Sequence, residues 1–194
     1  RTIAREKIAP RVAHYDETET YPEEAMRAIA EAGLYGVWLP EEYGGSGMDC
    51  LSLSLVEEEI AYVCAATGTN YGSTPLGGLP ILFAGTDEQK KKYLPRLATG
   101  EIVGCFGLTE PDAGSDPGGM KTKATRVQGG FLLNGSKMWI TNSPIADVAV
   151  VWGKLDDEGI RGFLVDRGTK GFATPIIEGK VSLRASVTGE IVMD

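Results

Sequence analysis

The hydrophobic pattern of the 194-residue chain changes once, near residue 100, and this change limits the fold more than any other feature. Before it, apolar residues recur with the spacing of amphipathic helices, and these segments begin with acidic residues and end at glycines. After it, short apolar stretches alternate with turn residues, as β-strands do. Because the junction at residues 99–101 is short, we expect two domains that pack together and leave a cleft between them.

Residues 1–100 are expected to form an amino-terminal all-α helical bundle domain. One helix starts at Tyr21-Pro22-Glu23-Glu24, where the proline suits the first turn and the acids lie near the positive end of the helix dipole, and it stops at Gly33. Further helices are expected from Leu51 to Ala65 and from Thr86, a capping residue, to Leu97. The short connections imply three or four antiparallel helices.

Residues 101–194 are expected to form a small antiparallel β barrel or sandwich, which makes the fold class α+β. Asn134-Gly135 lies between two apolar stretches and predicts a hairpin turn, because both residues accept positive φ. Further strands are expected at residues 147–153, 161–166 and 190–194. The chain starts without Met in a helix-like run and ends in a strand, so both ends are expected to continue in a longer protein.

Composition argues against several kinds of function. The formal net charge of -8 does not support a sequence-independent attraction to nucleic-acid phosphates. No stretch approaches the roughly 20 apolar residues of a membrane span and no signal-peptide pattern is present, so an intracellular protein is expected. His14, the single histidine, is expected on a helix surface, and no metal site is predicted. Cys50, Cys64 and Cys105 lack CxxC spacing and are interpreted as small hydrophobes.

Two segments carry candidate chemistry. In Phe106–Asp116 an apolar strand runs into a loop rich in Gly, Ser, Thr and Asp, which suits either an anion-binding loop or an exposed turn. In Lys137–Asn142 strand alternation places Trp139 and Thr141 on one face and Ile140 on the other. A flat heteroaromatic ring fits such a face, with the Thr141 hydroxyl bonding a ring nitrogen. The alternative is that Trp139 fills the core.

Together these segments resemble the acyl-CoA dehydrogenase family. The resemblance rests on Cys105–Asp116 followed by Asn134–Asn142, and it extends in order through Gly44-Gly45, Gly85–Lys90 and Leu183–Gly189 over essentially the whole chain. It implies a helical amino-terminal domain, a β domain that holds FAD in the cleft, and a carboxy-terminal helical domain that this chain lacks. The residues implied to contact FAD are Phe106, Leu108, Thr109, Gly114, Ser115, Trp139, Ile140 and Thr141. Ser115 is implied to meet the CoA part of the substrate as well.

The family removes hydrogen from Cα and Cβ of an acyl-CoA thioester, with a carboxylate as the base and the flavin as hydride acceptor. The base usually comes from the carboxy-terminal domain, so no catalytic residue is assigned in this chain, and the 194 residues alone are expected to be inactive. Glu110, Asp112 and Asp116 are interpreted as capping or turn residues. The segment Lys180–Ser186 resembles the glutaryl-CoA dehydrogenase branch. However, the region matching its carboxylate site, Thr67–Ser73, contains no cation, which favours a neutral acyl chain.

The resemblance also implies electron-transfer flavoprotein as the electron acceptor, a homotetramer when full length, and a bacterial cytoplasmic or mitochondrial matrix location. Two other interpretations remain open at the level of sequence. One is a non-catalytic module that binds a partner or a nucleotide through the β domain. The other is a related flavin oxidase or monooxygenase.

Overall fold

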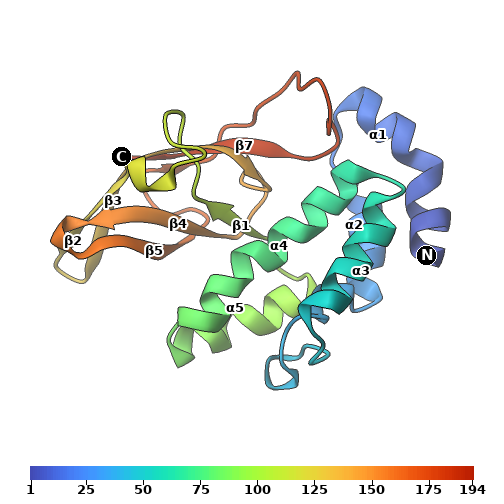
Figure 1. The fold of residues 1–194 in the computed structure, drawn as a ribbon, viewed down its shortest axis with the longest axis horizontal. Helices are drawn as coiled ribbons and strands as arrows, with labels where there is room; N and C mark the ends of the chain where they lie inside the picture. Colours follow the sequence, from blue (N-terminus) through green and yellow to red (C-terminus); the bar gives the residue numbers. More distant parts are fainter.

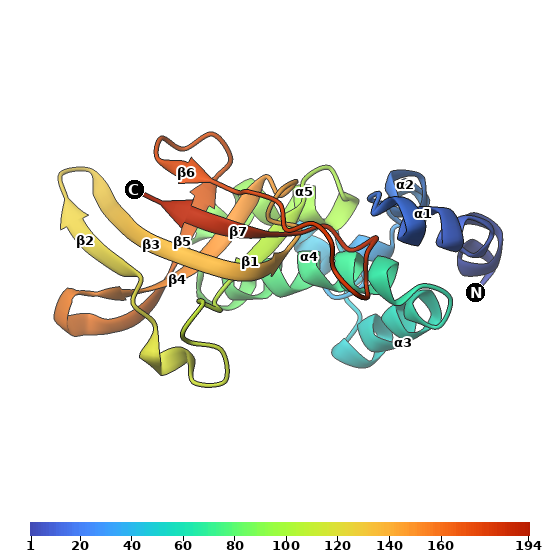
Figure 2. The ribbon, with the colours of Figure 1, turned by 90° about the horizontal axis from the view of Figure 1, so that it is seen from above.

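The computed structural model describes residues 1–194, apart from the side chain of Asp157. The α-helices are α1 (Val12–Thr18), α2 (Glu23–Glu31), α3 (Cys50–Ala61), α4 (Ala65–Ala84) and α5 (Asp87–Thr99). The strands are β1 (Gly104–Gly107), β2 (Lys123–Val127), β3 (Gly130–Thr141), β4 (Val148–Leu155), β5 (Gly159–Asp166), β6 (Phe172–Ala173) and β7 (Thr188–Met193). The helices gather on one side and the strands on the other, with the two chain ends at opposite ends of the molecule (Figures 1 and 2). The expected α+β fold is confirmed.

The strands form one curled sheet that is mixed rather than wholly antiparallel. β4 pairs antiparallel with β5 on one edge, and on its other edge it pairs in parallel with β1 and with the start of β2. β3 joins β2 to β7 through antiparallel pairs, and β6 extends the sheet beyond β7. The parallel pairs were not expected, because periodicity finds strands but does not say which strands become neighbours.

The hairpin predicted at Asn134-Gly135 is wrong. β3 continues straight through these residues, and the turn lies at Gln128-Gly129, between the paired residues Val127 and Gly130. Gly135 still has a positive φ of 146°, and a Cβ there would lie 2.6 Å from Thr122 Oγ1. The glycine therefore permits a close approach to a neighbouring chain segment instead of making a turn.

The helices with strong local signals form where expected. α2 begins at Glu23 and is followed by Gly33 with φ 70°, and α5 carries a capping box between Thr86 and Gln89. α3 covers most of the helix expected from Leu51 to Ala65 and ends at Ala61. These helices are confirmed because their start and stop residues act within the segment itself.

α4 was not predicted from the pattern, because its twenty residues include Pro75, Pro80 and several glycines. These small residues let the helix pack closely on its neighbours: a Cβ at Gly77 would lie 2.9 Å from the Cys105 nitrogen, and one at Gly78 would lie 2.6 Å from the Trp38 ring. α4 contacts α3 and α5 on one side and β1 on the other, so it joins the helices to the sheet (Figure 1). Close packing here outweighs low helix propensity.

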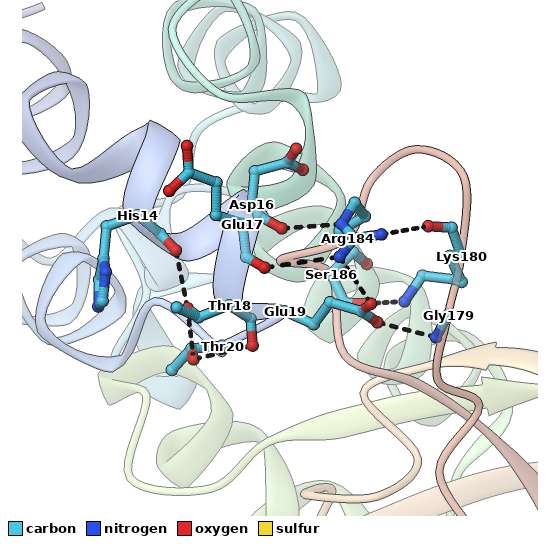
Figure 3. A network of polar contacts seen from close by, with 10 residues as sticks. All are labelled: His14, Asp16, Glu17, Thr18, Glu19, Thr20, Gly179, Lys180, Arg184 and Ser186. Atoms are coloured by element: carbon cyan, nitrogen blue, oxygen red, sulfur yellow. Dashed lines mark hydrogen bonds and ion pairs between the residues drawn. The ribbon is translucent and has the colours of Figure 1, made fainter.

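A second connection between the two halves is a cluster of polar contacts around Arg184 (Figure 3). The guanidinium donates to the Asp16 carbonyl at 2.9 Å and to the Lys180 carbonyl at 3.2 Å, and it forms an ion pair with Glu19 at 2.9 Å. Glu19 also accepts a hydrogen bond from the Gly179 amide at 2.9 Å. The loop before β7 is thereby fixed to the end of α1.

The expectations for His14 and the cysteines are confirmed at three of the four residues. His14 is exposed on α1, and Cys64 and Cys105 are buried free thiols. Cys50 is exposed at the first turn of α3, so its interpretation as a small hydrophobe is wrong. None of the helices in the described residues combines the length and the apolar character needed to cross a bilayer. The described side chains also include no group of three or more His, Cys, Asp or Glu placed to hold a metal ion.

Candidate functional site

A groove of about 500 Å³ lies where α3 and α4 face the ends of β1 and β3. Its sheet side brings together six of the eight residues that the sequence analysis assigned to the cofactor, namely Phe106, Leu108, Thr109, Trp139, Ile140 and Thr141. Its helical side consists of Glu57, Thr69, Gly72, Ser73 and Leu76. A groove of this size is in the range of small-molecule sites.

The two candidate segments meet because the chain after β1 runs alongside β3. The Met138 amide donates to the Thr109 carbonyl at 2.9 Å, which places Thr109 beside Trp139. Phe106, on β1, packs at a tilted angle on Trp152, with ring centroids 5.8 Å apart. Residues about thirty positions apart in the sequence thus form one wall of the groove.

Trp139 does not fill the core. The residue is 56% exposed, and its backbone has the left-handed φ of 63°. The pairing of β3 with β7 shifts between Lys137 and Ile140, so a β-bulge interrupts the simple alternation assumed from the sequence. As a result Trp139, Ile140 and Thr141 all contribute to the groove, although Ile140 is also buried among core residues. A bulky side chain on a left-handed backbone is costly, and such strain is typical of functional sites.

Thr141 is held by its backbone and leaves its hydroxyl available. Its carbonyl accepts a hydrogen bond from Ser73 Oγ of α4 at 3.1 Å, which ties the strand end to the helical wall. Within the described residues the Thr141 hydroxyl has no hydrogen-bond partner, while its side chain is only half-buried. A hydroxyl in this position can bond a polar atom of a ring lying along the groove.

The other two predicted residues lie outside the groove. Gly114 and Ser115 are exposed in the loop after β1, and a Cβ at Gly114 would meet no atom within 4 Å. In the same loop Asp112 forms an ion pair with Lys121 at 2.9 Å, and Asp116 accepts a hydrogen bond from the Gly118 amide at 3.1 Å. The interpretation of Asp116 as a turn residue is confirmed, and the exposed backbone at Gly114 is open to a ligand.

A buried ion pair that was not predicted from the sequence holds this loop. Lys137 is fully buried, and its Nζ lies 2.8 Å from Glu110 Oε1 and 3.1 Å from the Leu108 carbonyl. Glu110 also accepts hydrogen bonds from the amides of Lys121 at 2.6 Å and Thr122 at 3.0 Å. Glu110 therefore does organise a turn, as expected, but it does so as the partner of a buried cation. The available signal was a lysine directly before the apolar run Met138–Ile140.

The charged state of the pair follows from these contacts. Burial acts to raise the pKa of Glu110, but the Lys121 amide, the Lys137 ammonium and Thr122 together lower it to about 2. Burial also lowers the pKa of Lys137, and the carboxylate of Glu110 opposes that shift. Because a charge left alone in this environment would be costly, the two groups stabilise each other's ionised form.

Comparison with known proteins agrees with this arrangement. Residues 1–101 match the family model "Acyl-CoA dehydrogenase, N-terminal domain", and residues 105–194 match "Acyl-CoA dehydrogenase, middle domain". The chain is 41% identical to the mitochondrial isovaleryl-CoA dehydrogenase of Solanum tuberosum, over 99% of this chain and 48% of that protein. It is 40% identical to the short-chain specific acyl-CoA dehydrogenase of Clostridium acetobutylicum, over 100% of this chain and 52% of that protein.

A solved structure of a glutaryl-CoA dehydrogenase from Mycobacterium smegmatis in complex with FADH2 has 43% sequence identity and a TM-score of 0.94. That match covers 100% of this chain and 50% of the other. The chain thus spans about half the length of the relatives that it matches. Since both family models match in the expected order and the groove lies between the matched parts, the chain belongs to the acyl-CoA dehydrogenase family.

Proposed function

We propose that the full-length protein oxidises an acyl-CoA thioester to the 2,3-enoyl-CoA with FAD as its cofactor. The observation that carries this proposal is Trp139, exposed on a strained backbone beside the unpaired hydroxyl of Thr141 in the groove. Bound in this groove, FAD would supply the acceptor for the β hydrogen of the acyl chain, which leaves as hydride. The M. smegmatis relative, solved with FADH2, supports this choice of cofactor.

The residues of the groove fit a flavin ring. Trp139 would offer a flat apolar face to the ring, and the Thr141 hydroxyl would be free to donate to a ring nitrogen. The same wall of the groove holds Phe106, Leu108, Thr109 and Ile140, which would exclude water from a bound ring. Gly114 and Ser115 are proposed to meet the pyrophosphate and the CoA moiety. Both are exposed, and the open space at Gly114 allows a phosphate to approach the backbone.

Removal of the α proton needs a base within hydrogen-bond reach of the substrate. Glu110 is unsuited to this role, because it is bound by Lys137 and two amides and its pKa is low. We propose that the base lies in the part of the full-length protein outside these 194 residues. For the whole protein we also propose electron-transfer flavoprotein as electron acceptor, assembly as a homotetramer, and a bacterial cytoplasmic or mitochondrial matrix location.

Thr141→Val in the full-length protein tests the site. The substitution keeps the volume and removes one hydrogen bond, so we expect flavin reduction by butyryl-CoA to slow about fivefold, or about 1 kcal/mol. Anaerobic stopped-flow absorbance measures this rate, and the flavin spectrum checks that FAD remains bound. Thr125→Val, on the exposed part of β2, is the matched control. An unchanged rate would remove Thr141 from the site, and rapid reoxidation of the reduced flavin by oxygen would favour an oxidase.

A further inference from the structure

The helical wall of the groove carries one carboxylate, that of Glu57 on α3. This side chain lies over Gly72 of α4: a Cβ added at Gly72 would clash with Glu57 Oε1 and would lie 2.9 Å from Cδ. The carboxylate thus takes the space that a side chain at position 72 would fill. Thr69 and Ser73, one helical turn apart on α4, line the groove with it.

Glu57 has no compensating positive charge in the described part of the chain. No lysine, arginine or histidine is among the described residues that line the groove, and none of the described cations forms an ion pair with Glu57. Partial burial raises the pKa of Glu57, as expected for a carboxylate without a partner. The groove therefore presents a negative charge, facing the wall that contains Trp139 and Thr141.

This placement matters if the proposed function holds, on which the inference rests. A substrate that gives hydride to a ring beside Trp139 and Thr141 must enter the same groove, and its acyl chain must lie between that ring and the helical wall. We propose that Glu57 is a specificity-determining residue that excludes acyl-CoA thioesters whose chain ends in a carboxylate. Two unpaired carboxylates in a partly desolvated groove repel each other, whereas an uncharged chain end meets no such barrier.

The proposed role of Glu57 predicts a different substrate from the one named for a relative of similar sequence. The M. smegmatis structure is a glutaryl-CoA dehydrogenase at 43% identity, and glutaryl-CoA carries a distal carboxylate. If Glu57 acts as proposed, overall similarity is a poor guide to the substrate here. A single residue on α3 decides against the dicarboxylic thioester.

The test compares full-length protein with FAD bound, wild type and Glu57→Gln, on butyryl-CoA and glutaryl-CoA with an artificial electron acceptor. We expect the wild type to favour butyryl-CoA at least tenfold in kcat/KM. Glu57→Gln should reduce that preference at least tenfold, mainly through a lower KM for glutaryl-CoA. The control Glu58→Gln removes the neighbouring exposed carboxylate, which does not line the groove, and should leave both substrates unchanged.

Three results would overturn the inference. A wild-type preference for glutaryl-CoA, or an unaltered preference in Glu57→Gln, would show that Glu57 does not select the chain end. A hundredfold loss of butyryl-CoA oxidation in Glu57→Gln would instead make Glu57 the catalytic base. These outcomes differ from failure of the proposed function, in which no acyl-CoA would reduce the flavin of the wild type and the inference would fall with it.

Discussion

The buried pair of Lys137 and Glu110 offers a direct test of how the groove is held. Lys137→Met keeps an unbranched side chain of similar length but leaves the Glu110 carboxylate without its cation. The Lys137 side chain is 0% exposed and that of Glu110 is 6% exposed, so water cannot readily replace the lost partner. The loop that continues from Leu108 depends on the same contacts, because the Leu108 carbonyl also bonds Lys137.

We expect Lys137→Met to lower the free energy of unfolding by about 3 to 5 kcal/mol, which is the usual cost of removing one partner of a buried ion pair. Urea midpoints of the full-length protein, followed by tryptophan fluorescence, measure the loss, and the flavin spectrum reports whether FAD remains bound. Lys123→Met, on the exposed face of β2, is the matched control and should change stability by less than about 0.5 kcal/mol. The double variant Glu110→Gln with Lys137→Met should recover part of the loss, because no buried charge remains. A cost below about 1 kcal/mol for Lys137→Met would refute this reasoning.

The same pair sets a pH window. The pKa of Glu110 is lowered from 4.5 to about 2 in the folded protein, so its ionised form contributes stability above pH 4.5 that is lost as the pH falls toward 2. The difference corresponds to about 3 kcal/mol. We expect wild-type stability to fall more steeply between about pH 5 and about pH 2 than that of Glu110→Gln. Equal slopes in the two proteins would contradict the assigned pKa.

Three further predictions concern the fragment and two structural residues. Residues 1–194 expressed alone should show no acyl-CoA turnover and weak or no FAD binding, measured by dye reduction and by absorbance; turnover would place a competent base within the fragment. Arg184→Lys should lower the unfolding free energy of the full-length protein by about 1 to 2 kcal/mol, because lysine keeps the positive charge but loses the several N–H donors of the guanidinium. An unchanged urea midpoint would show that the contacts in Figure 3 do not stabilise the protein. Gly135→Ala should lower the unfolding free energy by about 1 to 3 kcal/mol, because φ is positive there and the new Cβ would lie 2.6 Å from Thr122 Oγ1. The control Gly130→Ala, where a Cβ meets no atom within 4 Å, should change stability little.

Several parts of this protein follow from the sequence alone. α2 and α5 form at their local capping and stop residues, and β4, β5 and β7 appear where apolar stretches predict strands. The two motif segments predicted which residues share the groove for six of the eight candidates, although their roles toward FAD stay a prediction. These features are local, or rest on motifs long enough to be distinctive, so they need no knowledge of distant contacts.

Other features were decided by contacts between distant segments. α4 is helical despite its prolines and glycines because it packs between the sheet and the other helices. Gly135 allows two chain segments to approach closely and does not form a turn. The bulge that exposes Trp139, the burial of Lys137 against Glu110 and the position of Glu57 over Gly72 each join residues that lie far apart in the sequence. Periodicity gives the face of a strand or helix but not its neighbour, so only the packed structure determines these pairings, and with them the charge and shape of the groove.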